Sequence, residues 1–288
     1  MSAGFYRRSG QSTNIVSIYP DGYLPLIAPK VTDYSVSGGV RWNLGDWKMD
    51  SSLGYGYNKM DYTITNTLNR SIGPTSKTTF DAGGFDYDQL VLNVSGVREV
   101  AVSGFSSPLN VAVGLEARRE GYSISAGEPD SYRNGGVLLA NGSVWIDTTC
   151  TTAAGCPTVS GSQVFPGFRP ANVLNKTRDA VGVYADFESN VTEKLLASAA
   201  VRAENYSDFG SNVSGKLSAR YDFTKQFALR SSASTGFRAP SVQQQYFATT
   251  STNFINGVPF EISTFPVSDP IAIADRKSTR LNSSHGYI

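Results

Sequence analysis

A hydrophobic alternation with a period of two residues recurs along this chain of 288 residues. It occupies eight segments, at 34–44, 47–58, 89–99, 110–118, 181–188, 197–206, 213–223 and 227–238. In the fifth of these, Val181, Val183 and Phe187 alternate with Asp186 and Glu188. Successive side chains of a β-strand point to opposite faces, so this period predicts strands with one apolar and one polar face. The sequence therefore predicts an all-β, antiparallel chain.

The connections between the predicted strands are short at one end and long at the other. Short links lie at Gly45-Asp46, 192–195 and 224–226, a moderate one at 104–109, and long ones at 67–85 and 127–178. This arrangement is typical of an up-and-down meander or barrel. Two further hairpins are predicted at 15–27, around Pro20-Asp21-Gly22, and at 247–267, around Asn256-Gly257, a favoured type I′ dipeptide.

Alternation fits two architectures. In a soluble β-sandwich the apolar face packs inward, whereas in an outer-membrane barrel it meets lipid. The barrel is favoured by small residues on the apolar faces, Gly, Ser and mixed charges on the polar faces, and strands long enough to cross about 25 Å of hydrocarbon. Aromatic residues at the predicted strand ends suit the membrane interfaces: Tyr34, Trp42, Trp47, Phe187, Phe223 and Phe227. The sandwich remains the alternative.

Composition excludes several classes of protein. Lysine and arginine number 25 and acidic residues 24, so the chain lacks the basic field that nucleic-acid binding requires. No apolar run approaches the roughly 20 residues of a transmembrane helix. The opening MSAGFYRRSG contains no signal-peptide segment, so we expect either a cytosolic chain or one whose true N-terminus is missing.

The residue inventory offers little for catalysis or metal binding. The only histidine is His285, near the end of the chain, so triads, Cys-His dyads and histidine metal sites are not expected. We predict no enzyme, and no catalytic, cofactor-binding or metal residues. Cys150 and Cys156 share a Gly/Thr-rich loop and lack the further ligands of a zinc site. A local disulfide, implying an oxidising compartment, is preferred over two unpaired thiols.

Two neighbouring motifs carry a family resemblance. Residues 231–245 read SSASTGFRAPSVQQQ, and residues 201–230 contain R-x-E-x-Y-S-D-F-G. Both resemble the barrel signatures of TonB-dependent outer-membrane receptors, as do YPDGYLPLI (19–27), NVAVGLEARREGYSISAGEP (110–129) and GSQVFPGFRPAN (161–172). The resemblance spans about residues 4–274. Its motif residues are Arg202, Glu204, Tyr206, Asp208, Gly236, Phe237, Arg238 and Pro240.

The resemblance implies an antiparallel up-and-down transmembrane β-barrel in the outer membrane of a Gram-negative cell. Such barrels have about 22 strands, and only eight are evident here. We therefore expect residues 1–274 to be a truncated, open slice of a longer receptor. Because eight strands cannot close at that curvature, unpaired edges are expected near 34–44 and 227–238. The plug domain and TonB box of the family have no counterpart before Met1.

The implied function is active uptake of a scarce extracellular solute, of the siderophore, haem, cobalamin or glycan class. The implied partners are the TonB complex, reached through the missing plug, the solute and outer-membrane lipid. A passive porin-like or structural barrel is the alternative, and a plug and TonB box in the parent gene would discriminate the two.

The motifs also have a physical interpretation. Pro240 cannot donate a ladder hydrogen bond and so should end a strand. Gly236 and Gly210 are expected to relieve crowding at bends. Charges on neighbouring strands predict cross-strand ion pairs, and they are interpreted as satisfying one another rather than a ligand. The residues predicted to face the lumen are Lys216, Arg220, Asp222 and Arg230.

The C-terminal residues 275–288 depart from this pattern. The alternation stops near Ala274, and DRKSTRLNSSH is similar to a translated adapter sequence. We interpret the segment as a non-native tail without function, with a genuine extracellular loop as the alternative.

Overall fold

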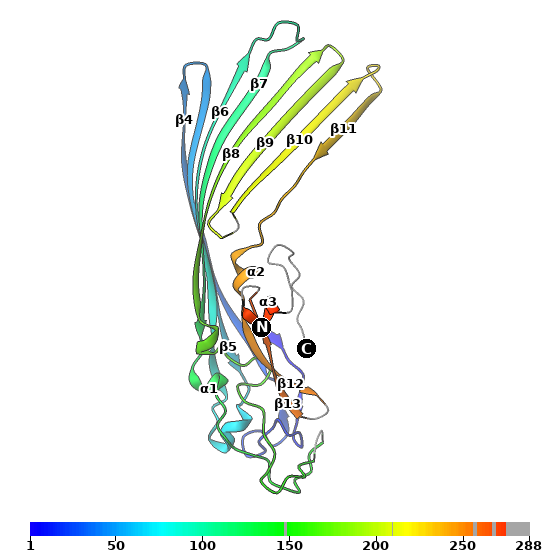
Figure 1. Cartoon of the computed structure of the whole chain (residues 1–288). Helices are drawn as coiled ribbons and strands as arrows, with labels where there is room; N and C mark the ends of the chain where they lie inside the picture. Colours follow the sequence, from blue (N-terminus) through cyan, green and yellow to red (C-terminus); the bar gives the residue numbers. More distant parts are fainter. Residues whose placement is uncertain (147–148, 209, 256–257, 267–268, 275–288) are drawn as a thin grey trace.

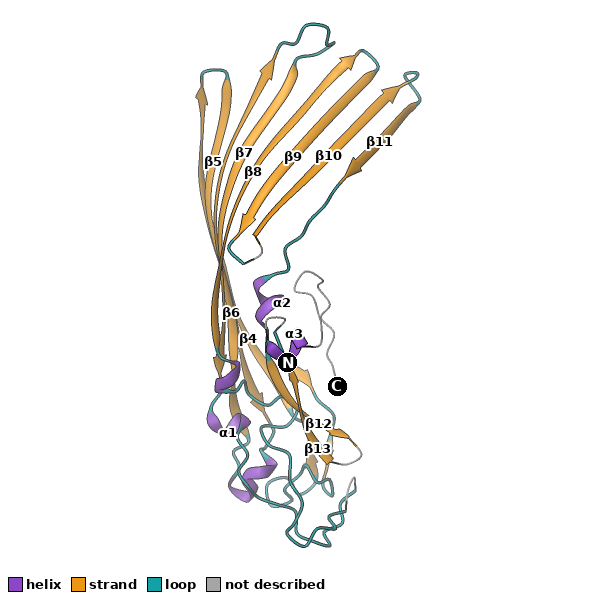
Figure 2. Ribbon diagram, viewed as in Figure 1, coloured by secondary structure: helices purple, strands orange, loops and turns teal. Residues whose placement is uncertain are grey.

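The computed structural model describes residues 1–146, 149–208, 210–255, 258–266 and 269–274. Nine strands form one antiparallel sheet in the order β1-β4-β5-β6-β7-β8-β9-β10-β11 (Figure 1). Two hairpins, β2–β3 and β12–β13, stand outside this sheet. Helices are few and short, as Figure 2 shows. The expected all-β, up-and-down architecture is confirmed.

The long strands are β4 (Leu26–Leu44), β5 (Trp47–Thr65), β6 (Thr79–Val100), β7 (Leu109–Ala126), β8 (Leu174–Thr192), β9 (Leu195–Tyr206), β10 (Gly210–Asp222) and β11 (Ala228–Ser234). The short ones are β1 (Ser2–Ala3), β2 (Arg7–Arg8), β3 (Gly22–Tyr23), β12 (Thr249–Ile255) and β13 (Val258–Thr264). The helices are α1 (Pro129–Tyr132), α2 (Val242–Tyr246) and α3 (Pro270–Ala274), with 3-10 turns η1 (Arg70–Thr75) and η2 (Pro170–Asn172). Among the described residues, no helix has the length and apolar character needed to cross a membrane.

The sheet is open. On its outer side β4 pairs only with β1, through Ser2↔Ile27 and Ala3↔Leu26, and β11 pairs only with β10. No ladder joins β4 to β11 in the described part of the chain. Residues 34–44 and 228–234 are therefore free edges, which confirms the predicted partial barrel.

Several boundaries differ from the sequence-based expectation. Most strands extend beyond the predicted segments at the long-loop end, where loops cover them and apolar alternation is no longer required. β11 is shorter than predicted and ends at Ser234. The hairpin at 15–27 is wrong, because Gly22–Tyr23 pairs with Arg7–Arg8 and residues 15–19 form turns. The hairpin β12–β13 is confirmed, although its Asn256-Gly257 turn and the tail 275–288 lie outside the described residues.

The long strands present two contrasting faces. One, here called the apolar face, carries residues such as Val36, Leu92 and Leu217, with 67%, 38% and 64% of their surface exposed. The other, the charged face, carries residues such as Glu116, Arg178 and Arg202, which the register places on the opposite side. The buried core is elsewhere, at the long-loop end of the sheet. There the loop layer, defined as residues 4–25, 66–78, 127–146 and 149–173, packs on the strand ends.

One ion pair lies at each end of the apolar face. At the short-turn end Arg98 lies 3.4 Å from Asp46, and toward the loops Arg119 lies 3.9 Å from Asp179. Between these two levels the apolar face of β4–β11 carries no charged residue, although these strands are fully described. Monomeric soluble proteins rarely expose so wide an apolar surface, and such surfaces mark contacts with lipid or protein.

A glycine bulge shapes the loop end of β6. The register of β5 and β6 shifts between Asp61 and Thr63, and Gly83 adopts a φ of 77° there. A Cβ atom at Gly83 would lie 2.3 Å from the carbonyl oxygen of Ser125. Both the backbone conformation and the space therefore require glycine, as in bulges whose first residue is left-handed.

We expect Gly83→Ala to lower the free energy of unfolding by at least about 2 kcal/mol, because it combines a positive φ with a backbone clash. Gly54→Ala on β5 is the matched control, since its Cβ would meet only the Ser37 Cβ, at 3.8 Å. Urea unfolding of both variants in detergent micelles checks the expectation, and equal midpoints would contradict it.

Candidate functional site

A buried arginine organises the charged face. Arg178, on β8, is 2% exposed. Its Nε donates to both carboxylate oxygens of Asp208 at 2.9 Å, and a terminal nitrogen lies 2.8 Å from Asp208 Oδ2. Its other terminal nitrogen donates to the carbonyl oxygen of Pro240 at 2.7 Å and lies 3.9 Å from Glu120.

Arg178 thereby joins three segments that are far apart in sequence. Asp208 belongs to the Y-S-D-F-G motif, Pro240 to G-F-R-A-P, and Glu120 to the REGY stretch of β7. A planar guanidinium with five donors can serve all three at once, which the point charge of a lysine cannot. The motifs are thus linked by one side chain that lies in none of them.

Aromatic residues lie around Arg178 and its carboxylate partners. The Tyr206 ring centre lies 6.0 Å from the Arg178 guanidinium and 6.2 Å from the Phe237 ring. The Tyr87 hydroxyl donates to Glu120 at 2.5 Å, and Arg118 lies 3.6 Å from the same carboxylate. Partial exclusion of water strengthens these interactions relative to those of exposed pairs.

Helix α2 closes the segment that follows Pro240. Ser241 and Gln244 form a reciprocal capping box with bonds of 2.9 and 3.1 Å. Val242 is fully buried with Tyr122 and Phe168, and Lys176 lies 5.5 Å above the Tyr246 ring. The G-F-R-A-P motif therefore leads the chain from the edge strand back onto the charged face (Figure 1).

A second ion cluster lies beside the first. Arg202 donates to Glu204 at 2.8 Å on its own strand and reaches Glu116, two strands away, at 3.5 Å. Gly182 lies between them, and a Cβ there would be 3.1 Å from the Arg202 nitrogen. The missing side chain of Gly182 leaves room for this crossing.

The predicted ion pairs between neighbouring strands β9 and β10 are wrong. The register sets Arg202 opposite Ser214, and Arg220 opposite Leu196, so the charges of the two strands do not face one another. Arg220 instead pairs with Asp222 of its own strand at 2.8 Å. Lys216, Arg220, Asp222 and Arg230 do share the charged face, and their position in a lumen stays a prediction.

Two glycines of the motifs do not have the role that was expected. A Cβ at Gly236 or Gly210 would meet no atom within 4 Å, so neither glycine relieves crowding. Gly210 is instead favoured by its φ of 78°, which starts β10 after the turn. Arg238 is exposed and forms no ion pair with the described part of the chain.

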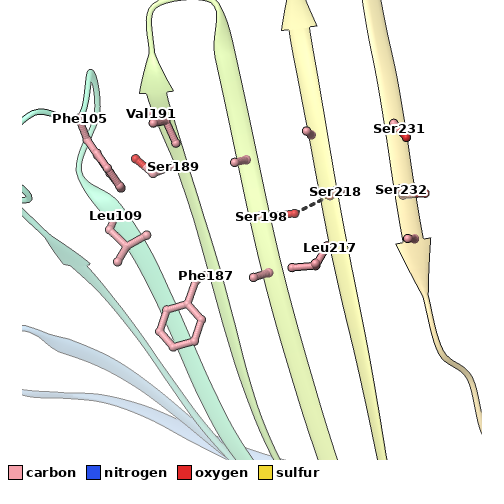
Figure 3. Close-up of a pocket in the computed structure, with 14 residues that line it drawn as sticks. Phe105, Leu109, Phe187, Ser189, Val191, Ser198, Leu217, Ser218, Ser231 and Ser232 are labelled. Atoms are coloured by element: carbon pink, nitrogen blue, oxygen red, sulfur yellow. Dashed lines mark hydrogen bonds between the residues drawn. The ribbon is translucent and has the colours of Figure 1, made fainter.

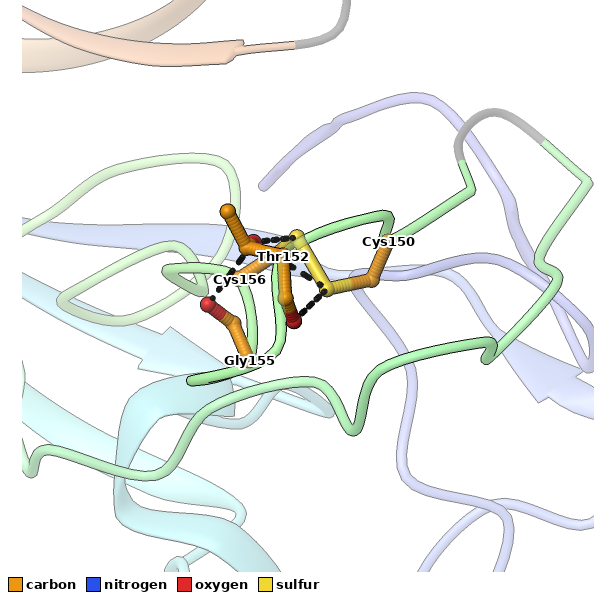
Figure 4. Close-up of a disulfide and its surroundings, with 4 residues drawn as sticks. All are labelled: Cys150, Thr152, Gly155 and Cys156. Atoms are coloured by element: carbon orange, nitrogen blue, oxygen red, sulfur yellow. Dashed lines mark hydrogen bonds between the residues drawn. A yellow bond between two sulfur atoms is a disulfide. The ribbon is translucent and has the colours of Figure 1, made fainter.

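The two cysteines form a disulfide in the loop layer, with Cα atoms 5.6 Å apart (Figure 4). Cys150 is 1% exposed. The Thr152 hydroxyl lies 3.1 Å from Cys156 Sγ and donates to the Gly155 carbonyl oxygen at 3.1 Å. The bridge fastens the loop that begins near residue 139, because Leu139 and Cys156 also pair through their backbones.

The apolar face contains a groove of about 490 Å³ near the short-turn end (Figure 3). Phe187, Leu109 and Leu217 flank a floor of small residues, mainly alanine and serine. Behind this floor, on the charged face, the side chains of Ser198 and Ser218 hydrogen-bond across β9 and β10 at 2.6 Å. The groove offers apolar contact and no arrangement for chemistry.

The described residues contain no group of three or more potential metal ligands. The charged face is a network of paired charges that fixes strands, motifs and α2 relative to one another. Sequence reasoning missed Arg178, Glu120 and Tyr87, since their importance depends on partners more than 25 positions away. The sequence 174–180, LNKTRDA, gave no signal for Arg178.

Comparison with known proteins assigns this chain to a protein family. The family model described as "TonB dependent receptor-like, beta-barrel" matches residues 2–265. The siderophore receptor PirA from Acinetobacter baumannii is similar at 15% identity and a TM-score of 0.47, covering 83% of this chain and 30% of that one. PirA from Pseudomonas aeruginosa has 12% identity and a TM-score of 0.39, with 78% and 40% covered. This chain thus spans less than half the length of either receptor, and no curated protein matches it in sequence.

We expect Arg178→Met to lower the free energy of unfolding by about 3–5 kcal/mol, because it leaves Asp208 partly buried without its cation and removes one of the two arginines beside Glu120. Arg220→Met removes an exposed pair and should cost about 0–1 kcal/mol. Hydrogen exchange checks the location of the effect: amides of 236–247 should lose protection in Arg178→Met alone. Unchanged protection there would contradict the role of Arg178.

Proposed function

Because the chain belongs to the family of TonB-dependent receptor-like β-barrels, we propose that it forms part of the wall of an outer-membrane receptor for active uptake of a scarce solute. Members of this family are transport receptors rather than enzymes. The proposed barrel portion is residues 1–274.

The observation that carries the proposal is the charge-free band of the apolar face. Leu90 pairs with Arg119, and Arg98 lies eight positions further along β6. Eight residues span about 26 Å along a strand at about 3.3 Å each, comparable to the ~25 Å apolar band of outer-membrane barrels. The ion pairs at its ends suit the two headgroup regions.

Aromatic residues support the same placement. At the loop side of the band the Tyr34 ring lies 5.3 Å from Tyr57 and 6.2 Å from Tyr55. Trp42 and Trp47 lie near its other end, beside the turn of β4 and β5. Amphipathic rings at both limits of an apolar band are typical of membrane interfaces. The tight turns then face the periplasm and the loop layer faces the medium.

The charged face would line the lumen in this placement. Energy coupling would pass from the TonB complex through a plug domain, as the family resemblance implies, to a solute such as an iron-siderophore, haem, cobalamin or glycan. Outer-membrane lipid would contact the apolar face and its groove.

Uptake by cells carrying the complete receptor tests the proposal. Accumulation of labelled iron-siderophore, haem, cobalamin and oligosaccharide is measured with the gene intact, with it disrupted, and after an uncoupler collapses the proton-motive force. If the accumulation of one solute falls both on gene disruption and after the uncoupler, active uptake is supported. If it falls on disruption alone, the barrel is passive. If the accumulation of every solute stays unchanged on disruption, the transport role is refuted.

Substitutions on the two faces test the membrane placement. Leu92→Arg puts a cation in the middle of the charge-free band and should cost about 2–4 kcal/mol in lipid vesicles. Asn93→Arg points to the charged face, where its partner on β7 is Glu116, and should be nearly neutral. Urea unfolding in vesicles measures both, and the reverse order would indicate that the apolar face does not meet lipid.

A further inference from the structure

Two segments of the loop layer, 4–25 and 66–78, meet around Tyr23. The pairing of β2 with β3 sets Arg7 opposite Tyr23. The Tyr23 hydroxyl donates to the Thr13 carbonyl oxygen at 3.1 Å, and the ring is buried with Ile15 and Leu68. This cluster is remote from the network around Arg178 and takes no part in it.

Arg70, two residues after Leu68, is 8% exposed. It forms no hydrogen bond or ion pair with the described part of the chain. Its guanidinium lies 5.5 Å from the centre of the Trp145 ring, a cation–π contact, and its buried Nε has no hydrogen-bond acceptor in the described part of the chain. A buried cation without an anion is costly, so a fold that keeps one requires an explanation.

The unpaired polar atoms of this region can all donate hydrogen bonds. Arg70 Nε and the Trp145 indole Nε1 are buried without an acceptor among the residues that the structure describes. The same holds for Arg7 Nε, Thr13 Oγ1 and Gln163 Nε2. Gln163 joins the cluster through its backbone, which donates to the Leu68 carbonyl oxygen at 3.2 Å. Positive charge with surplus donors is the complement of an oxyanion.

No nearby tyrosinate supplies the missing charge. Burial raises the pKa of the Tyr23 hydroxyl well above its ordinary value, so this group stays neutral. Burial also lowers the pKa of Arg70, but a guanidinium remains protonated in proteins at neutral pH. Tyr23 therefore does not neutralise Arg7 or Arg70.

We propose that Arg70, Trp145 and the donors around them form a binding site for a small oxyanion, a phosphate or carboxylate group. The site is independent of the transport role, since it needs only the loop layer. The disulfide contributes by fixing the Trp145 loop: Cys150 donates from its backbone to Ser143 at 3.1 Å, and Ile146 to Gly10 at 2.9 Å.

Trp145 provides the readout. In the purified chain carrying Trp42→Phe and Trp47→Phe, Trp145 is the only tryptophan. Titration with inorganic phosphate and with citrate, at constant ionic strength set by chloride, should change its emission saturably. A short-chain phosphatidate at equal phosphate concentration distinguishes a lipid headgroup from a free anion as the source, and saturable binding of either supports the site.

Arg70→Gln should weaken binding at least tenfold, whereas Arg41→Gln, which alters an exposed pair with Asp50 at the other end of the sheet, should leave it unchanged. Stability separates a binding role from a structural one. Without ligand, Arg70→Gln should match or exceed the unfolding midpoint of the parent, because it removes an unpaired buried cation. Phosphate or citrate should raise the midpoint of the parent and not that of Arg70→Gln.

The proposal is overturned if none of the three probes changes the Trp145 emission saturably. It is equally overturned if Arg70→Gln binds within twofold of the parent. A lower midpoint of Arg70→Gln without ligand, together with no anion effect on the parent, would assign Arg70 a structural role through its contact with Trp145.

Discussion

Each long strand presents an apolar face that stays exposed, and this constraint governs the rest of the structure. In a soluble protein such a face would be covered by a second sheet or by helices. Here it is interrupted only at its two ends, by the pairs Arg98–Asp46 and Arg119–Asp179. The polar groups are consequently gathered on the opposite face and in the loop layer, where they must satisfy one another.

That requirement explains the dense pairing on the charged face. Arg178 is nearly fully buried because it bonds Asp208 and the Pro240 carbonyl oxygen at once. Its position fixes the end of β8, the turn before β10 and the segment leading to α2. Gly182 contributes to the same pairing, because the absence of a side chain there lets Arg202 reach the Glu116 carboxylate two strands away.

Arg70 departs from this pattern. It is as inaccessible as many core residues, yet among the described residues its close partner is the face of an indole ring. Arg178, the other buried arginine of the described chain, has two carboxylates beside it, so leaving Arg70 without an anion there carries a local cost. Sites that bind ligands commonly retain such unfavourable groups, because the ligand supplies the missing interaction.

The sequence by itself determined the strands, their order and their two faces. The alternation of apolar and polar side chains depends only on neighbouring residues, and each face meets its lipid or aqueous surroundings directly. It also predicted the disulfide loop and the open edges. Only the tertiary structure decided which charges meet: the register set Arg202 opposite Ser214 and turned the expected pairs between β9 and β10 into pairs within a strand. Arg178 and Arg70 look alike in sequence. Long-range packing alone gave Arg178 two carboxylates and a carbonyl oxygen, and gave Arg70 the face of the Trp145 ring, since burial and hydrogen bonding depend on segments that only the fold brings together.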